Sequence, residues 1–188
     1  MNDKRTQLLE ASIDLFADEG FWNTPTARIA RHAGVATGTL FNYFESKDVL
    51  IDEVYMQLKH EWMHHIMQNF PQNGTIKEQI EHIWFRHIDW GLGFPRRYAL
   101  KQQLALSDLV SDEVQQRQQE ALAFGFEIVE RGMADGLFVP ISAEYFGMLM
   151  VANLDAAVQY ASAHQLKDMA LTRHITTSFE IFWKGITN

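Results

Sequence analysis

Apolar residues recur at intervals of three and four positions along most of the chain, which is the spacing of one face of an α-helix. The first such segment covers residues 4–19, and Gly20 predicts its end because glycine readily adopts the left-handed backbone that closes a helix. Its apolar residues form one wide stripe: Leu8, Leu9, Ile13, Leu15 and Phe16. With only four prolines and few β-branched runs, the pattern predicts an all-α fold of about nine helices.

Short helices follow the first one. Thr26 is predicted to cap a second helix that Gly34 ends, and Thr37 to cap a third helix over residues 38–44. The three-residue connection between them is typical of a helix-turn-helix. Ser46 is predicted to cap a long fourth helix. Further helices are predicted over residues 75–92, 96–107, 111–134, 142–164 and 167–185.

The helix-turn-helix segment separates into a core face and an outer face. Its apolar positions are predicted to pack the second and third helices against the first: Ile29, Ala30, Ala33, Val35, Leu40 and Phe44. On the third helix, the remaining positions face outward: Gly38, Thr39, Asn42 and Tyr43. A helix of this width fits the major groove of DNA with its N-terminal end toward the base edges.

Composition narrows the chemistry. The chain of 188 residues has no cysteine, which excludes disulfides, thiolate metal sites and a cysteine nucleophile. The net charge of -8 argues against general binding to polyanions. Residues 1–47 carry five basic and six acidic residues, whereas the remainder carries 11 and 18. Any contact with nucleic acid is therefore expected to be local and to involve the N-terminal end.

The segment from Thr24 to Phe44, TPTARIARHAGVATGTLFNYF, resembles the DNA-binding motif of the TetR/AcrR family, and residues 45–50 continue the match. The resemblance implies a transcription regulator that is not an enzyme, that binds an inverted-repeat operator in double-stranded DNA as a homodimer, and that responds to a small-molecule effector. It implies a DNA-binding domain over residues 1–47 and a ligand-binding and dimerisation domain over residues 48–188. The resemblance further implies that the protein represses transcription and that the ligand relieves this repression.

Several residues are expected to contact DNA. Thr39 and Asn42 are placed to contact bases, each at about 1–3 kcal/mol of discrimination. Helix N-termini at Thr26 and Thr37 favour phosphate, and the resemblance gives Lys47 a phosphate contact. The family commonly has tyrosine where this chain has Phe41. The full predicted set is Thr26, Arg28, Thr37, Gly38, Thr39, Phe41, Asn42, Tyr43 and Lys47. The alternative is a helix-turn-helix used only for packing or for binding another protein.

An effector site is expected around a glycine and proline break at residues 91–95. Aromatic residues flank this break, and it resembles, together with part of the fourth helix, segments of multidrug-responsive family members that control efflux. Asp89 and Asp155 could add negative charge, so a planar aromatic compound or a lipophilic cation is expected. The predicted ligand contacts are Tyr55, Lys59, Trp62, Trp90, Phe94, Tyr98 and Asp155. The alternative is that these aromatic residues are core.

The last two predicted helices carry more apolar surface than a small bundle needs. The resemblance implies a four-helix dimer interface built from two copies of this pair. The predicted contacts are Tyr145, Phe146, Leu149, Ala152, Phe179, Phe182 and Trp183. The alternative is that these residues close the core of one protomer.

A second motif points to another class of function. Residues 60–64, HEWMH, match the H-E-x-x-H pattern of zinc peptidases, in which His60 and His64 would bind the metal and Glu61 would act as base. Glu78 or Glu81 could be nominated as a third ligand, and a structural metal site could also draw on His65, His82 or His87. A metal-dependent hydrolase therefore remains an alternative, although we expect no catalytic residues, no cofactor and no metal. Without an apolar leader or a spanning segment, the protein is expected to be cytoplasmic, with no membrane partner.

Overall fold

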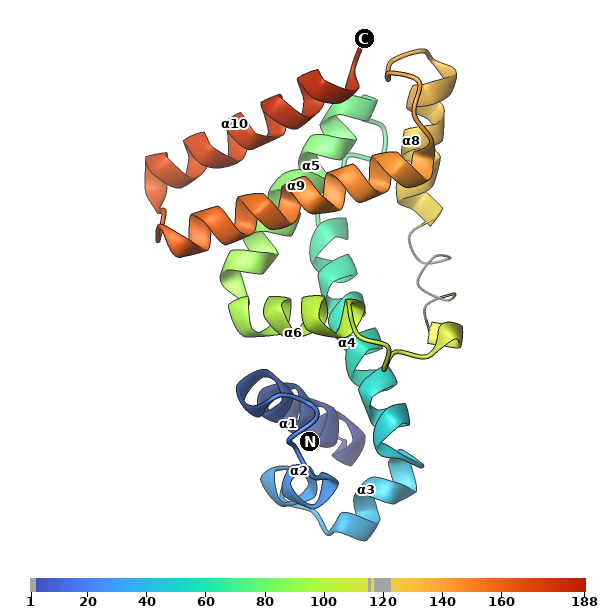
Figure 1. The fold of residues 1–188 in the computed structure, drawn as a ribbon, viewed down its shortest axis with the longest axis vertical. Coiled ribbons are helices and arrows are strands. Elements are labelled where there is room, and N and C mark those ends of the chain that lie inside the picture. The colour runs from blue at the N-terminus through green and yellow to red at the C-terminus, as the bar shows by residue number, and fades with distance from the viewer. Residues whose placement is uncertain (1–2, 115, 117–122) are drawn as a thin grey trace. The chain divides into compact units, whose positions relative to one another are not determined.

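The computed structural model describes residues 3–114, 116 and 123–188 (Figure 1). Within these ranges the regular elements are helices, and one isolated antiparallel bridge joins Phe138 and Thr187. The helices are α1 (Lys4–Glu19), α2 (Thr26–His32), α3 (Thr37–Tyr43), α4 (Lys47–Met67), α5 (Ile76–Gly93), α6 (Pro95–Ala105), α8 (Ala123–Ala134), α9 (Ala143–Ala163) and α10 (Asp168–Ile186). The predicted all-α fold is confirmed. Part of the helix predicted over residues 111–134 lies outside the described residues.

The chain forms two compact units. The first consists of Met1–Met63 with Phe94–Gln118, and the second of His64–Gly93 with Gln119–Asn188, as far as these residues are described. The first unit therefore adds α6 and most of α4 to the predicted DNA-binding domain. The functional division after residue 47 stays a prediction.

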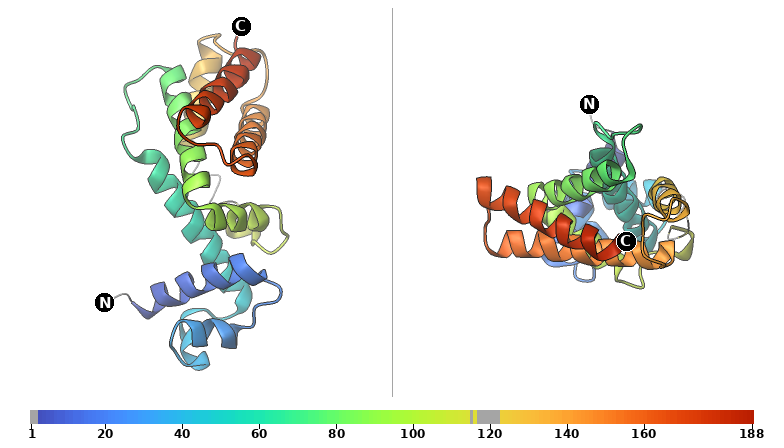
Figure 2. Two further views of the ribbon diagram at one scale, coloured as in Figure 1. Left: turned by 90° about the vertical axis from the view of Figure 1, so that its left-hand side faces the viewer. Right: turned by 90° about the horizontal axis from the view of Figure 1, so that it is seen from above.

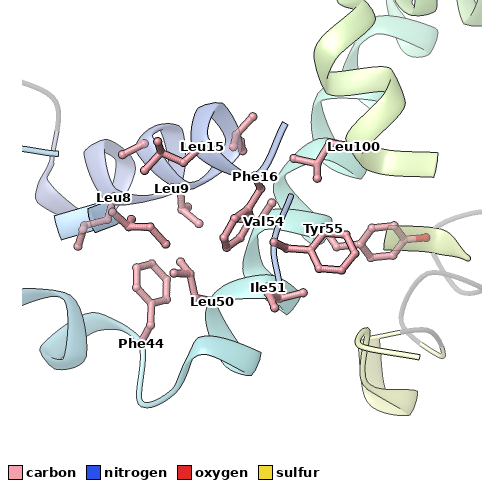
Figure 3. Packing of buried hydrophobic residues seen from close by; sticks show 14 of the residues in the cluster. Leu8, Leu9, Leu15, Phe16, Phe44, Leu50, Ile51, Val54, Tyr55 and Leu100 are labelled. Atoms are coloured by element: carbon pink, nitrogen blue, oxygen red, sulfur yellow. The ribbon is translucent and has the colours of Figure 1, made fainter. Parts of the chain in front are cut away.

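The core of the first unit is built from α1, the two short helices, the start of α4 and α6. Figure 3 shows side chains from α1, α4 and α6 directed toward a common centre. Phe16 and Leu50 are fully buried there, and Leu100 brings α6 into the same cluster. Burial of each such side chain contributes about 1.5–3 kcal/mol. The core face predicted for the helix-turn-helix is confirmed, because Ile29, Ala30, Leu40 and Phe44 are buried and Ala33 and Val35 pack against them.

Helix ends follow the sequence in part. Gly20, at φ 78°, ends α1, and its amide donates to the carbonyl of Phe16 at 3.0 Å. The Ser46 hydroxyl accepts from the amide of Val49 at 3.2 Å, and Ser142 caps α9 in the same way. The prediction that Thr26 and Thr37 cap the two short helices is wrong. Both are the first helical residues, and the cap positions are Pro25 and Ala36, without a side-chain hydrogen bond.

The second unit packs α5 and α8 against the antiparallel pair α9 and α10, which lie side by side in Figures 1 and 2. Aromatic rings fill its core. The Trp84 ring stacks on Phe182 with 5.0 Å between centroids, and the indole nitrogen donates to Ser178 at 3.2 Å. Only glycine fits at position 132 without a rearrangement, because a Cβ there would lie 2.2 Å from the Phe138 ring. Among the described helices, none is long and apolar enough to cross a membrane.

Candidate DNA-binding surface and effector site

The third helix presents a polar and aromatic face above a buried anchor. Leu40 is fully buried, whereas Phe41 and Tyr43 are 45% and 41% exposed. The other outward positions are exposed except for Thr39, which is half-buried. The anchor fixes α3 to α1 and α2, which are both in contact with it. The exposed side chains of α3 therefore sit on a rigid support, as recognition of base edges requires.

Thr26 and Thr37 begin α2 and α3 but do not cap them, contrary to the prediction. Because neither hydroxyl caps its helix, the side chains do not satisfy the first helical amides. Thr37 is exposed and Thr26 is half-buried. Both residues therefore stay candidates for hydrogen bonds to phosphate rather than structural caps.

Two basic residues flank the recognition helix. Lys47 opens α4 and is half-buried, and burial lowers its pKa against a smaller opposing effect of the Asp48 charge. Arg28 on α2 forms an ion pair with Glu19 at the end of α1. A phosphate that contacts Arg28 would therefore compete with the Glu19 carboxylate. Among the described residues, no carboxylate forms a salt bridge with Lys47.

Helices α4 and α6 bring five side chains of the first unit together, which we call the caged-lysine cluster: Tyr55, Lys59, Trp62, Tyr98 and Lys101. The ammonium nitrogen of Lys59 lies 5.8 Å from the centroid of the Tyr55 ring and 5.5 Å from that of Trp62. The ammonium nitrogen of Lys101 lies 5.8 Å from the same Trp62 ring and 5.8 Å from Tyr98. Two cations from different helices therefore converge on one indole.

The caged-lysine cluster is largely removed from water. Tyr55, Tyr98 and Lys101 are each 7% exposed, and Lys59 is half-buried. Burial lowers the pKa of Lys59 and raises that of Tyr55, because the charged form of each group is disfavoured away from water. Lys101 also donates to the amide oxygen of Gln102 at 3.1 Å. Sequence reasoning missed Lys101, although its position three residues after Tyr98 puts both on one helix face.

The remaining predicted ligand contacts are placed differently. Trp90 on α5 and Asp155 on α9 belong to the second unit, and Trp90 is 2% exposed. Phe94 precedes α6 and is about half exposed. The structure thus groups Tyr55, Lys59, Trp62 and Tyr98 in one cluster, whereas Trp90 and Asp155 lie in the other unit.

The two carboxylates predicted to attract a cationic ligand have neighbours of their own in the second unit. Asp89 is paired with His65 at 2.8 Å and with Arg86 at 3.4 Å. The Asp155 carboxylate lies 3.8 Å from the ring of His87, which is 3% exposed.

The H-E-x-x-H motif lies on α4, where its glutamate serves an ion-pair network. Arg97 donates to both oxygens of Glu61 at 2.8 Å, and Gln57 donates to one of them at 2.9 Å. The other end of the Arg97 guanidinium donates to Glu10 on α1. A search of the described residues finds no group of three or more metal-binding side chains. The position of Glu61 thus favours a structural role over that of a general base.

The residues predicted for the dimer interface divide into two sets. The described structure buries Phe146, Phe179, Phe182 and Trp183 inside the second unit, where they surround Trp84 and Phe138. These four rings therefore build the protomer. Tyr145, at 51% exposure, and Ala152 face outward, and Leu149 is half-buried. Further apolar residues of the pair are exposed and were not predicted: Met148, Val151, Tyr160, Met169 and Ile181.

Comparison with known proteins identifies the family. The model of bacterial regulatory proteins of the tetR family matches residues 8–54. The crystal structure of a protein from Shewanella sp. PV-4, assigned to the tetR family of transcription regulators, is 30% identical, covers 100% of both chains and superposes with a TM-score of 0.91. The chain belongs to the TetR family. Its helix-turn-helix is the family's DNA-binding element, and the prediction of a transcription regulator is confirmed.

Two curated relatives match this chain beyond its N-terminal helix-turn-helix domain (the head). The fatty acid metabolism regulator protein of Bacillus subtilis is 24% identical over 71% of this chain and 68% of its own length. The transcriptional repressor KstR2 of Mycolicibacterium smegmatis is 29% identical over 73% of this chain and 68% of its own length. The expected likeness to the multidrug-responsive branch is not confirmed, because neither relative is named for drug efflux.

Proposed function

We propose that this TetR family protein is a ligand-responsive repressor that binds an inverted-repeat operator as a homodimer and leaves it when a small apolar effector binds. The observation that carries the proposal is the exposed polar face of α3 above the buried Leu40. The name of the mycobacterial relative supports repression over activation. Two heads about 34–36 Å apart, or somewhat more, would meet successive major grooves.

The recognition helix supplies the sequence contacts in this proposal. Asn42 is exposed and has the side chain that pairs with adenine through two hydrogen bonds. Thr39 and Phe41 offer methyl and ring surfaces to thymine methyl groups. Gly38 permits close approach of the backbone, and Tyr43, Thr37, Thr26, Lys47 and Arg28 contact phosphates. Phosphate contacts position the head and base contacts give specificity.

The exposed apolar side chains of α9 and α10 form the homodimer interface in this proposal. Tyr145, Met148 and Ala152 follow one another at three- and four-residue spacing and so share one face of α9. Ile181 on α10 is 66% exposed. Two copies of such a helix pair build a four-helix interface that covers all of these side chains.

Helix α6 couples the effector site to the head. Arg97 on α6 is paired with Glu10 on α1 and with Glu61 on α4. Arg96 is paired with Asp18, also on α1. A ligand that moves Lys101 and Tyr98 on α6 would therefore shift α1, against which the recognition helix α3 packs. A coupling free energy of about 1–3 kcal/mol would change operator affinity roughly 5- to 150-fold.

A selection from random duplex DNA with the purified protein tests the proposed function. The expected product is an inverted repeat that binds two protomers, because a two-fold symmetric dimer selects a two-fold symmetric site. Recovery of no enriched sequence would contradict the proposal and favour a helical adaptor that binds protein. A single half-site bound by one protomer would contradict the homodimer.

A further inference from the structure

We propose that Arg5 is a positioning residue for the recognition helix, which it holds in place by joining Glu53 on α4 to Phe44 at the end of α3. Arg5 lies in the first turn of α1 and is not among the residues proposed to contact DNA. The inference rests on the proposed function, since it concerns how the head presents α3 to an operator. It gives a role in sequence recognition to a side chain that acts without touching DNA.

The Arg5 guanidinium contacts two other elements of the head. One of its nitrogens donates to the carboxylate of Glu53, in the second turn of α4. Its central carbon lies 5.5 Å from the centroid of the Phe44 ring, which is within the range of a cation-π contact. A single side chain of α1 is therefore in contact both with α4 and with the residue that ends α3.

Phe44 carries this contact to the recognition helix. It directly follows α3, and its amide donates to the carbonyl of Leu40 at 3.0 Å. Its ring is 1% exposed and belongs to the buried cluster of Leu8 and Leu50, toward which it points in Figure 3. Because Asn42 lies only two residues before Phe44, a fixed Phe44 ring also fixes the part of α3 that carries this proposed base contact.

The exposure of the ion pair favours a positioning role over a stabilising one. The side chains of Arg5 and Glu53 are 42% and 40% exposed, and ion pairs as exposed as this one contribute little to the free energy of unfolding. Recognition of a base is more demanding, because the contacting side chain has to be held within about 0.5 Å of its productive geometry. Loss of the Arg5 contacts should therefore affect sequence recognition more than folding.

A direct contact between Arg5 and a phosphate is the competing explanation, and Glu53 separates the two. If Arg5 bound phosphate, the Glu53 carboxylate would compete for it, so Glu53→Met would strengthen binding to any duplex. If Arg5 positions α3, Glu53 is its anchor, and Glu53→Met weakens binding to the preferred sequence even though it removes a negative charge. The two roles thus predict effects of opposite sign.

Titration of the whole chain with labelled duplexes tests the inference. The duplexes are the selected inverted repeat and an unrelated sequence of equal length, each at several salt concentrations. We expect Arg5→Met and Glu53→Met to bind the inverted repeat about tenfold or more weakly than the wild type, since misplaced base contacts are lost. Binding to the unrelated duplex should change by less than about twofold, and the salt dependence should stay that of the wild type, because phosphate contacts are kept.

Lys77→Met is the matched control. Lys77 on α5 has the same two kinds of contact in the second unit, an ion pair with Glu180 and the face of the Phe179 ring at 5.8 Å. Its side chain is 43% exposed, close to the value for Arg5. This variant should bind both duplexes as the wild type does. Circular dichroism checks that each variant is folded, and Glu53→Met decides the matter if Arg5→Met does not fold.

Four outcomes would overturn the inference. They are wild-type affinity of Arg5→Met for the inverted repeat, tighter binding by Glu53→Met, an equal loss of affinity on both duplexes, or an equal loss in Lys77→Met. The proposed function would survive each of them, since the wild type would still prefer the inverted repeat. A wild type that does not distinguish the two duplexes would instead reject the proposed function.

Discussion

Arg97 on α6 donates to both carboxylate oxygens of Glu61 on α4, at 2.8 Å each. The same guanidinium reaches Glu10 on α1. Burial alone would lower the pKa of Arg97, but the hydrogen bond to Glu10 and the charges of Glu61 and Glu10 outweigh it and raise the pKa overall. One arginine therefore ties α6 to α1 and to α4.

Replacing this arginine should weaken both stability and the response to ligand. Arg97→Met leaves Glu10 and Glu61 without their shared partner, so we expect a loss of about 1–2 kcal/mol in the free energy of unfolding, after allowance for partial exposure. Urea denaturation measures it. Arg96→Met is the control, because Arg96 and its partners are more exposed, and its stability should change by less than about 0.5 kcal/mol. Equal effects of the two variants would show that the Arg97 network has no special role.

Helix capping gives a second comparison within the head. Ser46→Ala removes the hydroxyl that accepts from Val49 and should cost about 0.5–2 kcal/mol in the free energy of unfolding. Thr37→Ala removes a hydroxyl that caps nothing, so its unfolding should change by less than about 0.5 kcal/mol while operator affinity falls. Thermal or urea denaturation of both variants, beside operator binding, checks this. A larger loss of stability from Thr37→Ala would contradict the structure of the cap.

The proposed dimer interface predicts the effect of a charge on α9. Met148 is 64% exposed in the protomer, so Met148→Glu should leave the fold intact. It should instead produce monomers, because a buried carboxylate at the interface would lack a partner. Light scattering over a dilution series measures the mass. Leu106→Glu is the control, since Leu106 is 90% exposed and lies outside the helix pair. A Met148→Glu variant that stays dimeric would place the interface elsewhere.

The buried charge of Lys59 predicts a pH dependence of stability. Its pKa in the folded protein lies below the ordinary value of 10.5, so the folded state releases this proton before the unfolded state does. The cost of burying the charge is complete below the folded pKa and disappears as pH rises toward 10.5. Lys59→Met should therefore be more stable than the wild type at pH 7, and the difference should shrink by pH 9.5. Urea denaturation at both values measures it, and a constant or growing difference would contradict the desolvation of Lys59.

The positions of the helices could be predicted from the sequence more accurately than the contacts of individual side chains. Spacing of Leu8, Ile13 and Phe16 is enough to predict α1, because the helical period is local information. The capping error at Thr26 and Thr37 arose because a threonine favours both the cap and the first turn, and the preceding residues Pro25 and Ala36 took the cap position instead. A shift of one residue changes the role of a hydroxyl without changing the helix.

The surfaces of α9 and α10 were harder to predict for another physical reason. Both helices are apolar over much of their circumference, so periodicity does not tell which ring meets the protomer core and which meets a partner. Phe146 and Tyr145 are neighbours, yet the first is fully buried and the second is half exposed. Lys101 escaped prediction because a lysine on an amphipathic helix is usually solvated, and its burial depends on residues of α4 that are distant in sequence.

The most direct test of the account measures affinity for the selected inverted repeat at several salt concentrations, with the wild type, Asn42→Ala and Asn73→Ala. Asn42 is exposed on α3, and Asn73 is exposed in the loop before α5. We predict a steep salt dependence for all three proteins, because phosphate contacts release counterions. Asn42→Ala should lose about 1–3 kcal/mol per half-site, whereas Asn73→Ala should match the wild type. Equal affinities of the three proteins, or affinity independent of salt, would contradict recognition of DNA by α3.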